Sequence, residues 1–225
     1  MGKTVVVGAI LIAVALVASS ILAVGPSLLG TGGRVEGAER IDVSVIEEQS
    51  LPYIGDASSR YRVYVFYDFL CPFCAEDLNE SIDDLEEYAS KGVKVVFVDF
   101  PTHEASVPIH SIARCVYKER GTGEFLELLK GIYALYMATG NPPTMLDVLT
   151  VMNELGIDYP DQACVDNVRW DISGQAYRLL TELGIRGTPT YIFYDAETGK
   201  GFVMIGAIGP ETLRNSIETL MKGIE

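Results

Sequence analysis

Apolar residues gather in short runs along the chain, and the runs rich in β-branched and aromatic residues predict strands. The strongest are YRVYVFYDF at 61–69 and VKVVFVDF at 93–100. Near the C-terminus, TPTYIFYD at 188–195 and GFVMIGAI at 201–208 flank a glycine-containing turn and predict a hairpin. IDVSVI at 41–46 begins with alternating apolar and polar residues, which predicts a short edge strand.

Between these strands the apolar residues recur at helical spacing. In the segment after the first long strand they are Leu78, Ile82, Leu85 and Ala89. Gly92 then provides the residue type that favours a helix C-terminus. Helical patterns fill most of residues 105–184, where glycine and proline clusters divide them into at least four segments, and a last helix begins at Pro210.

This order of elements indicates the fold class. A strand, a helix and a second strand in succession need a crossover connection, which makes the two strands parallel, and the terminal hairpin adds antiparallel strands to the same sheet. The helical block at 105–184 is too long for a loop. We therefore predict an α/β domain from residues 50–104 and 185–225, with a mixed central sheet and an inserted helical subdomain.

The N-terminus departs from this pattern. Residues 4–24 contain no charge over 21 positions, and a helix of that length spans about 30 Å, enough to cross the hydrocarbon core of a bilayer. The apolar region of a cleavable signal peptide is usually about half as long, so we predict an uncleaved transmembrane helix within residues 1–24. The small residues of SILAVG leave a cleaved signal as the alternative. Residues 25–49, glycine-rich at first, are predicted to be a linker.

Charge and cysteine content bear on where the protein works. Lys3 precedes the apolar run and Arg34 follows it, and we place the amino terminus inside and the bulk of the chain outside the cell membrane. Four cysteines are an even set, as expected in an oxidising compartment. The chain has 17 basic and 31 acidic residues, a net charge of -14, which argues against nucleic acid as a partner. The seven acids of 75–87, Asp77 among them, are expected on a solvated helix face.

The sequence CPFC follows the strand at 61–69 and opens the next helix. The first turn of a helix leaves backbone N–H groups unpaired and carries partial positive charge, which stabilises a thiolate at Cys71. Cys74 lies on the same turn, within disulfide reach, and Pro72 suits the first helical position. The pattern predicts a redox-active pair.

A cysteine pair at this spacing can also bind a metal or form a purely structural bridge. A structural zinc site would need further ligands at typical spacing, but Cys115 and Cys164 stand far apart, and His103 and His110 have no characteristic spacing. A copper chaperone would want a cluster of methionine or histidine near the pair. A purely structural bridge across two intervening residues would restrain little of the unfolded chain. We therefore predict no metal site.

A second signature is the Thr188–Pro189 dipeptide at the start of a strand. A proline there lacks a donor for the ladder and is normally unfavourable. If the bond is cis, the backbone of Thr188 is free to pair with an extended peptide; a trans proline is the alternative. Phe73, between the cysteines, is expected to be exposed and to contact unfolded chains.

Three stretches together carry a family resemblance: VFYDFLCPFC, the segment from VKVVFVDF to GTGEF, and GIRGTPTYIFYDAETGKGFVMIGAI. Over roughly residues 50–222 the chain resembles the DsbA-like branch of the thioredoxin superfamily, and most of all its membrane-tethered thiol–disulfide oxidoreductases. The resemblance implies a thioredoxin fold with a helical insertion and no cofactor. It also implies Cys71 as the attacking sulfur, Cys74 as the resolving sulfur and Pro189 as a cis-proline that faces them.

The resemblance further implies an activity and its partners. We expect the Cys71–Cys74 disulfide to oxidise thiols of folding secreted proteins, with a quinone-linked membrane thiol oxidase as the partner that regenerates it. A disulfide reductase or isomerase is the alternative enzyme, and a redox-inactive, tethered peptide-binding module is the alternative outside enzymes. The chain departs from the family at Val65, six residues before the first cysteine, where such proteins usually bury an acid; Asp68 is the nearer acid.

The remaining cysteines, Cys115 and Cys164, lie on apolar faces of two predicted helices. These faces should pack together and bring the sulfurs close, and an oxidising compartment favours a bridge over two buried free thiols, which are the alternative. The resemblance adds weight, because some tethered DsbA-like proteins brace their helical insertion in this way. We predict a structural disulfide between them.

Overall fold

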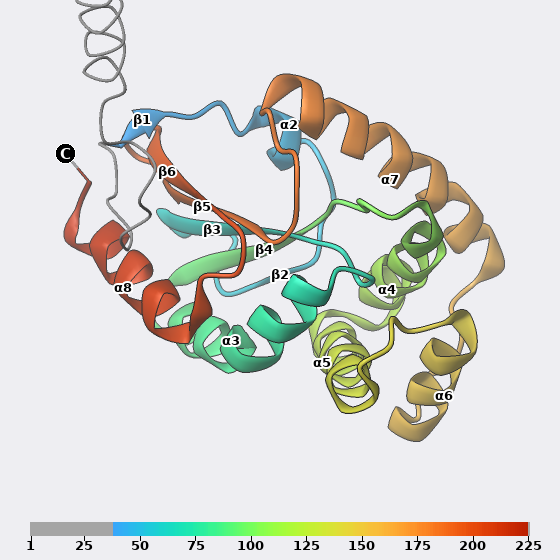
Figure 1. The fold of residues 1–225 in the computed structure, drawn as a ribbon. Helices are drawn as coiled ribbons and strands as arrows, with labels where there is room; N and C mark the ends of the chain where they lie inside the picture. The colour runs from blue at the N-terminus through green and yellow to red at the C-terminus, as the bar shows by residue number, and fades with distance from the viewer. Residues whose placement is uncertain (1–37, 225) are drawn as a thin grey trace, which may run out of the picture. The chain divides into compact units, whose positions relative to one another are not determined.

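Six strands form one mixed sheet within residues 38–224, the part of the chain that the computed structural model describes (Figure 1). They are β1 (Glu39–Arg40), β2 (Tyr53–Ile54), β3 (Tyr61–Tyr67), β4 (Val93–Asp99), β5 (Thr190–Asp195) and β6 (Lys200–Ile205). Their order across the sheet is β1-β6-β5-β3-β4-β2. Strand β3 runs parallel to β4 and antiparallel to β5, and β5 and β6 form the predicted hairpin. The predicted mixed sheet is confirmed.

Helices cover both faces of the sheet (Figure 1). They are α2 (Ser44–Glu47), α3 (Pro72–Ser90), α4 (Val107–Arg120), α5 (Thr122–Thr139), α6 (Met145–Leu155), α7 (Gln162–Glu182) and α8 (Gly209–Lys222), with a 3-10 turn, η1 (Glu104–Ser106), before α4. Helices α3, α5 and α8 contribute to the core on one face, and α2 and the C-terminal part of α7 to the core on the other. The central strands β3, β4 and β5 are therefore buried on both sides.

Strand β3 shows why these residues form the centre of the sheet. Val63, Val65 and Tyr67 point into the core that α3 and α5 complete, while Tyr64 and Phe66 point into the core beneath α7. All five side chains are fully buried. A strand with helices on both faces needs apolar residues at every position, as this one has.

The helical insertion predicted between β4 and β5 is also confirmed. Helix α4 packs against both α5 and α7, and α6 packs against α5. Helix α7, 21 residues long, then leads back to the sheet, where Leu179 joins the core beneath it. The insertion therefore begins immediately after β4, close to the end of the sheet at which the cysteine pair lies.

The prediction of a strand at 41–46 was wrong. The strand at this end of the chain is β1, which pairs with β6, and the following residues form the single helical turn α2. The carboxylate of Asp42 accepts a hydrogen bond from the backbone N–H of Ser44 at 3.0 Å, a local bond that favours a helical turn. The turn buries both Val45 and Ile46 on the same side, which an alternating strand cannot do.

The linker predicted over residues 25–49 therefore extends too far, because residues 39–47 already pair with or pack on the sheet. The transmembrane helix predicted within residues 1–24 lies outside the described residues, so it stays a prediction. Within residues 38–224, no helix is long and apolar enough to span a bilayer.

Asp77 is a second correction. It lies on the inner face of α3, and 2% of it is exposed, whereas the sequence pattern predicted a solvated acid. Its carboxylate accepts hydrogen bonds from the hydroxyl of Tyr191 (2.6 Å) and the backbone N–H groups of Ile208 (3.1 Å) and Gly209 (2.7 Å). One buried carboxylate thus joins α3 to β5 and to the start of α8.

Candidate active site

The cysteine pair lies where β3 ends and α3 begins. Cys71 is the residue before the helix, in an extended conformation, and Pro72 occupies the first helical turn, as predicted. The turn that leads to Cys71 is held by Asp68, whose side chain accepts from the N–H of Leu70 (3.0 Å) and whose carbonyl accepts from the N–H of Cys71 (3.1 Å). The sulfur of Cys71 therefore sits at the positive end of a 19-residue helix.

The structure brings Thr188 and Pro189 to this pair. The sulfurs of Cys71 and Cys74 are not bonded to each other, so the structure shows the dithiol. The Cys71 thiol donates a hydrogen bond to the carbonyl oxygen of Thr188 at 3.2 Å. The Thr188–Pro189 peptide bond is cis. Residues 117 positions apart in the sequence thus form one site.

The two cysteines differ in their surroundings. Cys74 is fully buried, whereas 6% of Cys71 remains exposed. An attacking sulfur from another molecule therefore meets Cys71 first. This difference in access is the one that the predicted roles of attacking and resolving cysteine require.

Two exposed apolar side chains lie near the pair. Phe73, between the cysteines, is 61% exposed, as expected. Ile205, at the end of β6, is 79% exposed and pairs with Thr190, the residue that follows Pro189. The N–H of Gly206 donates to the carbonyl of Pro189 (2.8 Å), which fixes the end of β6 beside the proline. A polypeptide bound at Cys71 would find apolar surface here.

The two thiols also differ in their pKa values. The pKa of Cys71 is lowered to about 6, and the largest cause is a hydrogen bond from Cys74. Burial acts in the opposite direction and raises this pKa. Thr188 and the backbone N–H groups of Cys74 and Phe73 lower it further. Burial, together with the neighbouring Cys71, raises the pKa of Cys74 well above its usual value. Near neutral pH the reduced site therefore holds a thiolate at Cys71 and a thiol at Cys74.

We expect the thiolate absorbance of the reduced protein to titrate with a midpoint near pH 6, from the pKa of about 6 at Cys71. Because this pKa is depressed, ionisation stabilises the reduced fold at pH values above the unfolded pKa of about 8.5, and that contribution is lost as the pH falls through 6. Cys71→Ser is the control, since it should remove the low-pH absorbance step. A midpoint at the ordinary thiol value would contradict the stabilisation of the thiolate.

A group of buried charges lies behind the cysteine turn. Asp68 is fully buried and accepts hydrogen bonds from the hydroxyl of Thr102 (2.6 Å) and from the backbone N–H (2.9 Å) and Nδ1 (2.7 Å) of His103. Burial alone would raise the pKa of Asp68, but His110, Thr102 and the N–H of Leu70 outweigh it and hold the pKa well below its usual range. Asp68 is therefore an ionised carboxylate beneath the active-site turn.

His110 lies between Asp68 and a second buried carboxylate, Asp99. Its Nδ1 is 2.6 Å from Asp99 Oδ1, and its Nε2 is 3.8 Å from Asp68 Oδ1. Asp99 also accepts from Nε of Arg114 (2.6 Å) and the hydroxyl of Tyr67 (2.9 Å). Burial alone would lower the pKa of His110, but the carboxylates of Asp68 and Asp99 outweigh burial and raise it. Burial alone would raise the pKa of Asp99, but Arg114 and His110 outweigh burial and lower it to about 2.

Sequence reasoning missed these charges as a group. The available signal was that Asp68 and Asp99 each come at the carboxyl end of one of two parallel strands, and such ends lie at the same edge of a sheet. His103 and His110 were considered only as possible metal ligands. In the structure both contact Asp68 instead.

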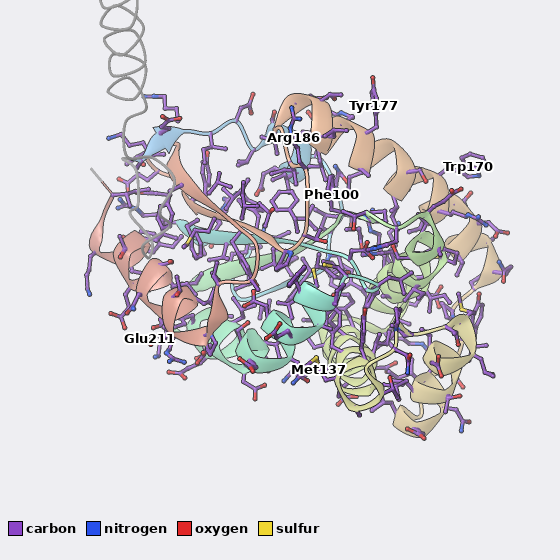
Figure 2. All side chains as sticks on the ribbon, viewed as in Figure 1. Phe100, Met137, Trp170, Tyr177, Arg186 and Glu211 are labelled. Carbon is purple, nitrogen blue, oxygen red and sulfur yellow. A yellow bond between two sulfur atoms is a disulfide. The ribbon has the colours of Figure 1, made fainter. Side chains whose placement is uncertain are left out.

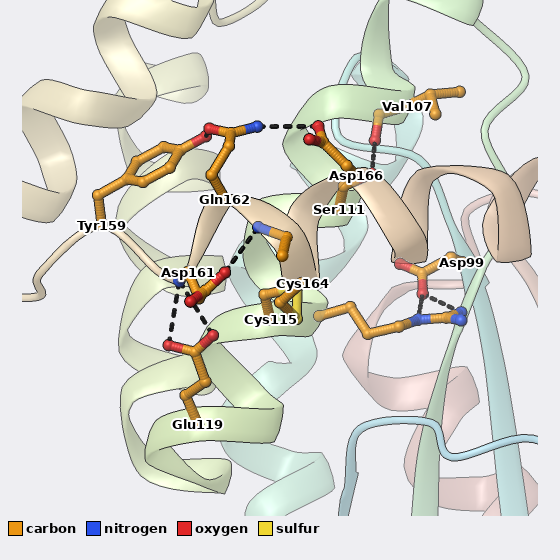
Figure 3. The surroundings of a disulfide bond; sticks show 12 residues. Asp99, Val107, Ser111, Cys115, Glu119, Tyr159, Asp161, Gln162, Cys164 and Asp166 are labelled. Carbon is orange, nitrogen blue, oxygen red and sulfur yellow. Dashed lines mark hydrogen bonds and ion pairs between the residues drawn. A yellow bond between two sulfur atoms is a disulfide. The ribbon is translucent and has the colours of Figure 1, made fainter.

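Cys115 and Cys164 are bonded to each other, with 6.0 Å between their Cα atoms (Figure 3). The bridge joins α4 to the first turn of α7. Beside it, the N–H of Asp161 donates to the carboxylate of Glu119 at 3.0 Å, and Asp161 in turn accepts from the N–H of Ala163 at 2.6 Å (Figure 3). The disulfide is thus part of a wider connection between the two helices, and it is separate from the Cys71–Cys74 pair.

Exposed aromatic residues on α7 do not belong to the site. Figure 2 shows Trp170 and Tyr177 projecting outward from this helix, and they are 80% and 69% exposed.

Comparisons with solved structures agree with this architecture. The fold is similar to alpha-DsbA1 of Wolbachia pipientis, with 14% identity, a TM-score of 0.62 and coverage of 77% of this chain and 92% of that one. It is also similar to the catalytic domain of Proteus mirabilis ScsC (20% identity, TM-score 0.59, 77% and 90% covered) and to a periplasmic thioredoxin-like protein from Salmonella enterica (19%, 0.61, 82% and 100%). At these identities the likeness shows the fold.

Sequence comparison gives the family. A search of curated proteins finds no match. A profile described as thioredoxin matches residues 47–218, which include β3, the cysteine pair, the helical insertion and most of α8. This match extends over more than half of the chain, and the fold is that of DsbA-like structures. The protein therefore belongs to the thioredoxin family.

Proposed function

We propose that this protein is a thiol–disulfide oxidoreductase that exchanges its Cys71–Cys74 disulfide with thiols of other proteins, most favourably as an oxidant. The observation that carries the proposal is the contrast between the two sulfurs. Cys71, the more exposed of the two, has a pKa of about 6, while the fully buried Cys74 has a pKa raised well above the usual value. The proteins with a similar fold include one described as a thiol-disulfide exchange protein, alpha-DsbA2 from Wolbachia pipientis.

The chemistry follows from this contrast. A substrate thiolate attacks the Cys71 sulfur of the disulfide; a mixed disulfide forms, the Cys71–Cys74 bond breaks, and Cys74 leaves as a thiolate that takes up a proton. A second substrate thiolate then attacks the substrate sulfur of the mixed disulfide. Cys71 leaves as a stable thiolate, the substrate is oxidised by two electrons, and the protein is reduced by two.

The direction of transfer rests on the stability of that leaving thiolate. Interactions that lower the pKa of Cys71 stabilise the reduced protein relative to the disulfide, which makes the disulfide a stronger oxidant. The hydrogen bonds from Cys74 and from the backbone N–H groups at the start of α3 act in this sense. Oxidation of substrate is therefore the favoured direction.

The proposal also includes the class of substrate, the location of the protein and the partner that regenerates it. Exposed Phe73 and Ile205 beside the pair favour unfolded or folding polypeptides with free thiols as substrates. The apolar run at 4–24 favours a membrane-anchored protein with its catalytic domain outside the cytoplasm, and the resemblance to DsbA-like proteins favours a quinone-linked membrane oxidase as the regenerating partner.

The reduction potential and the direction of exchange test the proposal. We expect a Cys71–Cys74 potential nearer to the roughly −120 mV of DsbA than to the roughly −270 mV of thioredoxin, and we expect formation of disulfides in a reduced, unfolded protein. A thioredoxin-like potential with reduction of substrate disulfides would favour the reductase or isomerase. Binding of unfolded protein with no exchange in either direction would favour the peptide-binding module.

A further inference from the structure

The chain contains two histidines, and both lie against one carboxylate. His103 Nδ1 is 2.7 Å from Asp68, and His110 Nε2 is 3.8 Å from Asp68. His103 reaches Asp68 from a half-exposed position, whereas His110 is completely buried. The side chains that ordinarily titrate near neutral pH are thus gathered behind the cysteine turn.

His110 is unusual because one of its ring nitrogens has no hydrogen-bond partner. Its Nδ1 bonds Asp99, but its buried Nε2 lies 3.8 Å from Asp68, too far for a good hydrogen bond. The ring is held from the sides by Tyr67 and Phe69, whose ring centroids are 4.9 and 4.8 Å away. A buried imidazole beside two carboxylates is stable as a cation only as long as both remain charged.

The charges around His110 come from every element packed on it. Strand β3 and the turn after it contribute the Tyr67 hydroxyl and the Asp68 carboxylate, and β4 contributes Asp99. Helix α4 itself adds Arg114, which is paired with Asp99. Three further side chains surround this group. His103 contacts Asp68, and the neutral amide of Gln175 on α7 accepts a hydrogen bond from Arg114. The hydroxyl of Tyr133 on α5 donates to the Asp68 carbonyl.

Asp68 connects this group to Cys71. Its carbonyl accepts the N–H of Cys71, and its side chain accepts the N–H of Leu70, so it determines the shape of the turn that presents Cys71. The carboxylate that His110 faces is therefore part of the turn that carries Cys71.

We propose that His110 is a positioning residue for disulfide exchange, whose imidazolium holds Asp68 and the Cys71 turn in place and whose proton is bound more tightly when Cys71 is a thiolate. The proposal rests on the proposed oxidoreductase function. Reduction of the disulfide by a substrate dithiol adds two electrons and releases two substrate protons; Cys74 takes one. The other goes to solvent, or to His110 in molecules where the imidazole is neutral.

A merely structural histidine would not respond to the redox state of the cysteines, and this difference gives the test. The full chain is titrated by NMR in its disulfide and dithiol forms, and His103→Gln identifies the remaining histidine signal as that of His110. We expect the His110 midpoint to be higher in the dithiol form by about half a pH unit, as expected for moderately separated charges inside a protein. In Cys71→Ser, which cannot form the thiolate, reductant should leave the midpoint unchanged.

A variant pair gives a second readout. His110→Gln retains a hydrogen-bonding side chain and removes the charge; we expect it to raise the thiolate midpoint of Cys71 by about half a pH unit. His103→Gln, at the exposed side of the same carboxylate, is the matched control and should shift it less because solvent screens its charge. If His110→Gln fails to fold, the NMR comparison of the unaltered chain still decides.

Equal His110 midpoints in both redox forms, or an unchanged Cys71 midpoint in folded His110→Gln, would overturn the proposal. Both measurements use small-molecule reductants and do not depend on a protein substrate. Failure of the oxidoreductase function would appear separately, as a protein that shows these shifts but exchanges no disulfide with other proteins.

Discussion

Cys71→Ser should abolish disulfide exchange in both directions, with a loss of at least about a thousandfold, because it removes the accessible sulfur through which exchange passes. Cys74→Ser should behave differently. It leaves the Cys71 thiolate free to attack a substrate disulfide but removes the sulfur that resolves the product, so mixed disulfides with substrate should accumulate. The contrast follows from the fully buried position of Cys74 behind Cys71.

Non-reducing electrophoresis after incubation with an oxidised substrate protein measures this outcome. Cys74→Ser should give a reductant-sensitive adduct with the mass of both proteins, and Cys71→Ser should give none. The variant with both substitutions controls for adducts through other residues. Equal trapping by the two single variants would show that the roles of attacking and resolving sulfur are assigned wrongly.

The second large effect concerns the bridge in the helical insertion. Replacing both Cys115 and Cys164 by alanine should lower the free energy of unfolding by up to about 4 kcal/mol, the chain-entropy value for a bridge with a sequence separation of 49. The double variant is preferred to either single one, because a single substitution leaves an unpaired thiol that can form disulfides with other molecules. Urea denaturation of both proteins with Cys71–Cys74 in the same redox state gives the difference.

Selective reduction is the control for this experiment. A mild reductant should open the Cys71–Cys74 disulfide and leave the other bridge closed, since Cys115 is fully buried and Cys164 is only partly exposed. Thiol counting in denaturant should then find two thiols, and none before reduction. Four thiols after mild reduction, or two before it, would be incompatible with a stable structural bridge.

The sequence was informative wherever a local pattern decides the structure. The continuous apolar run of β3 predicts a central strand because a strand covered on both faces has no polar side. The pattern failed at 41–46, where six residues are too few to distinguish an alternating strand from a helical turn begun by Asp42. It also missed β2, whose two residues, Tyr53 and Ile54, give no periodicity to detect.

The candidate site also contains residues that a local sequence pattern predicts and residues that it does not. CPFC and Thr188–Pro189 each carry a local signal, and the resemblance joined them before the structure brought Cys71 to Thr188. No local sequence pattern marks Asp68, Asp99 and His110 as a group. These three residues meet only through the packing of two strands and a helix. Asp77 was assigned to solvent because six neighbouring acids masked its place on the inner face of α3.

The bridge between α4 and α7 has a consequence for how the protein is made. Cys115 is completely enclosed in the finished fold and Cys164 is only partly exposed, so the two sulfurs are easiest to oxidise while the helices are still coming together. If the protein introduces disulfides into others, then each new copy is itself a client of that activity during its own biogenesis. The first molecules in a cell would depend on older copies, or on another oxidant, to mature.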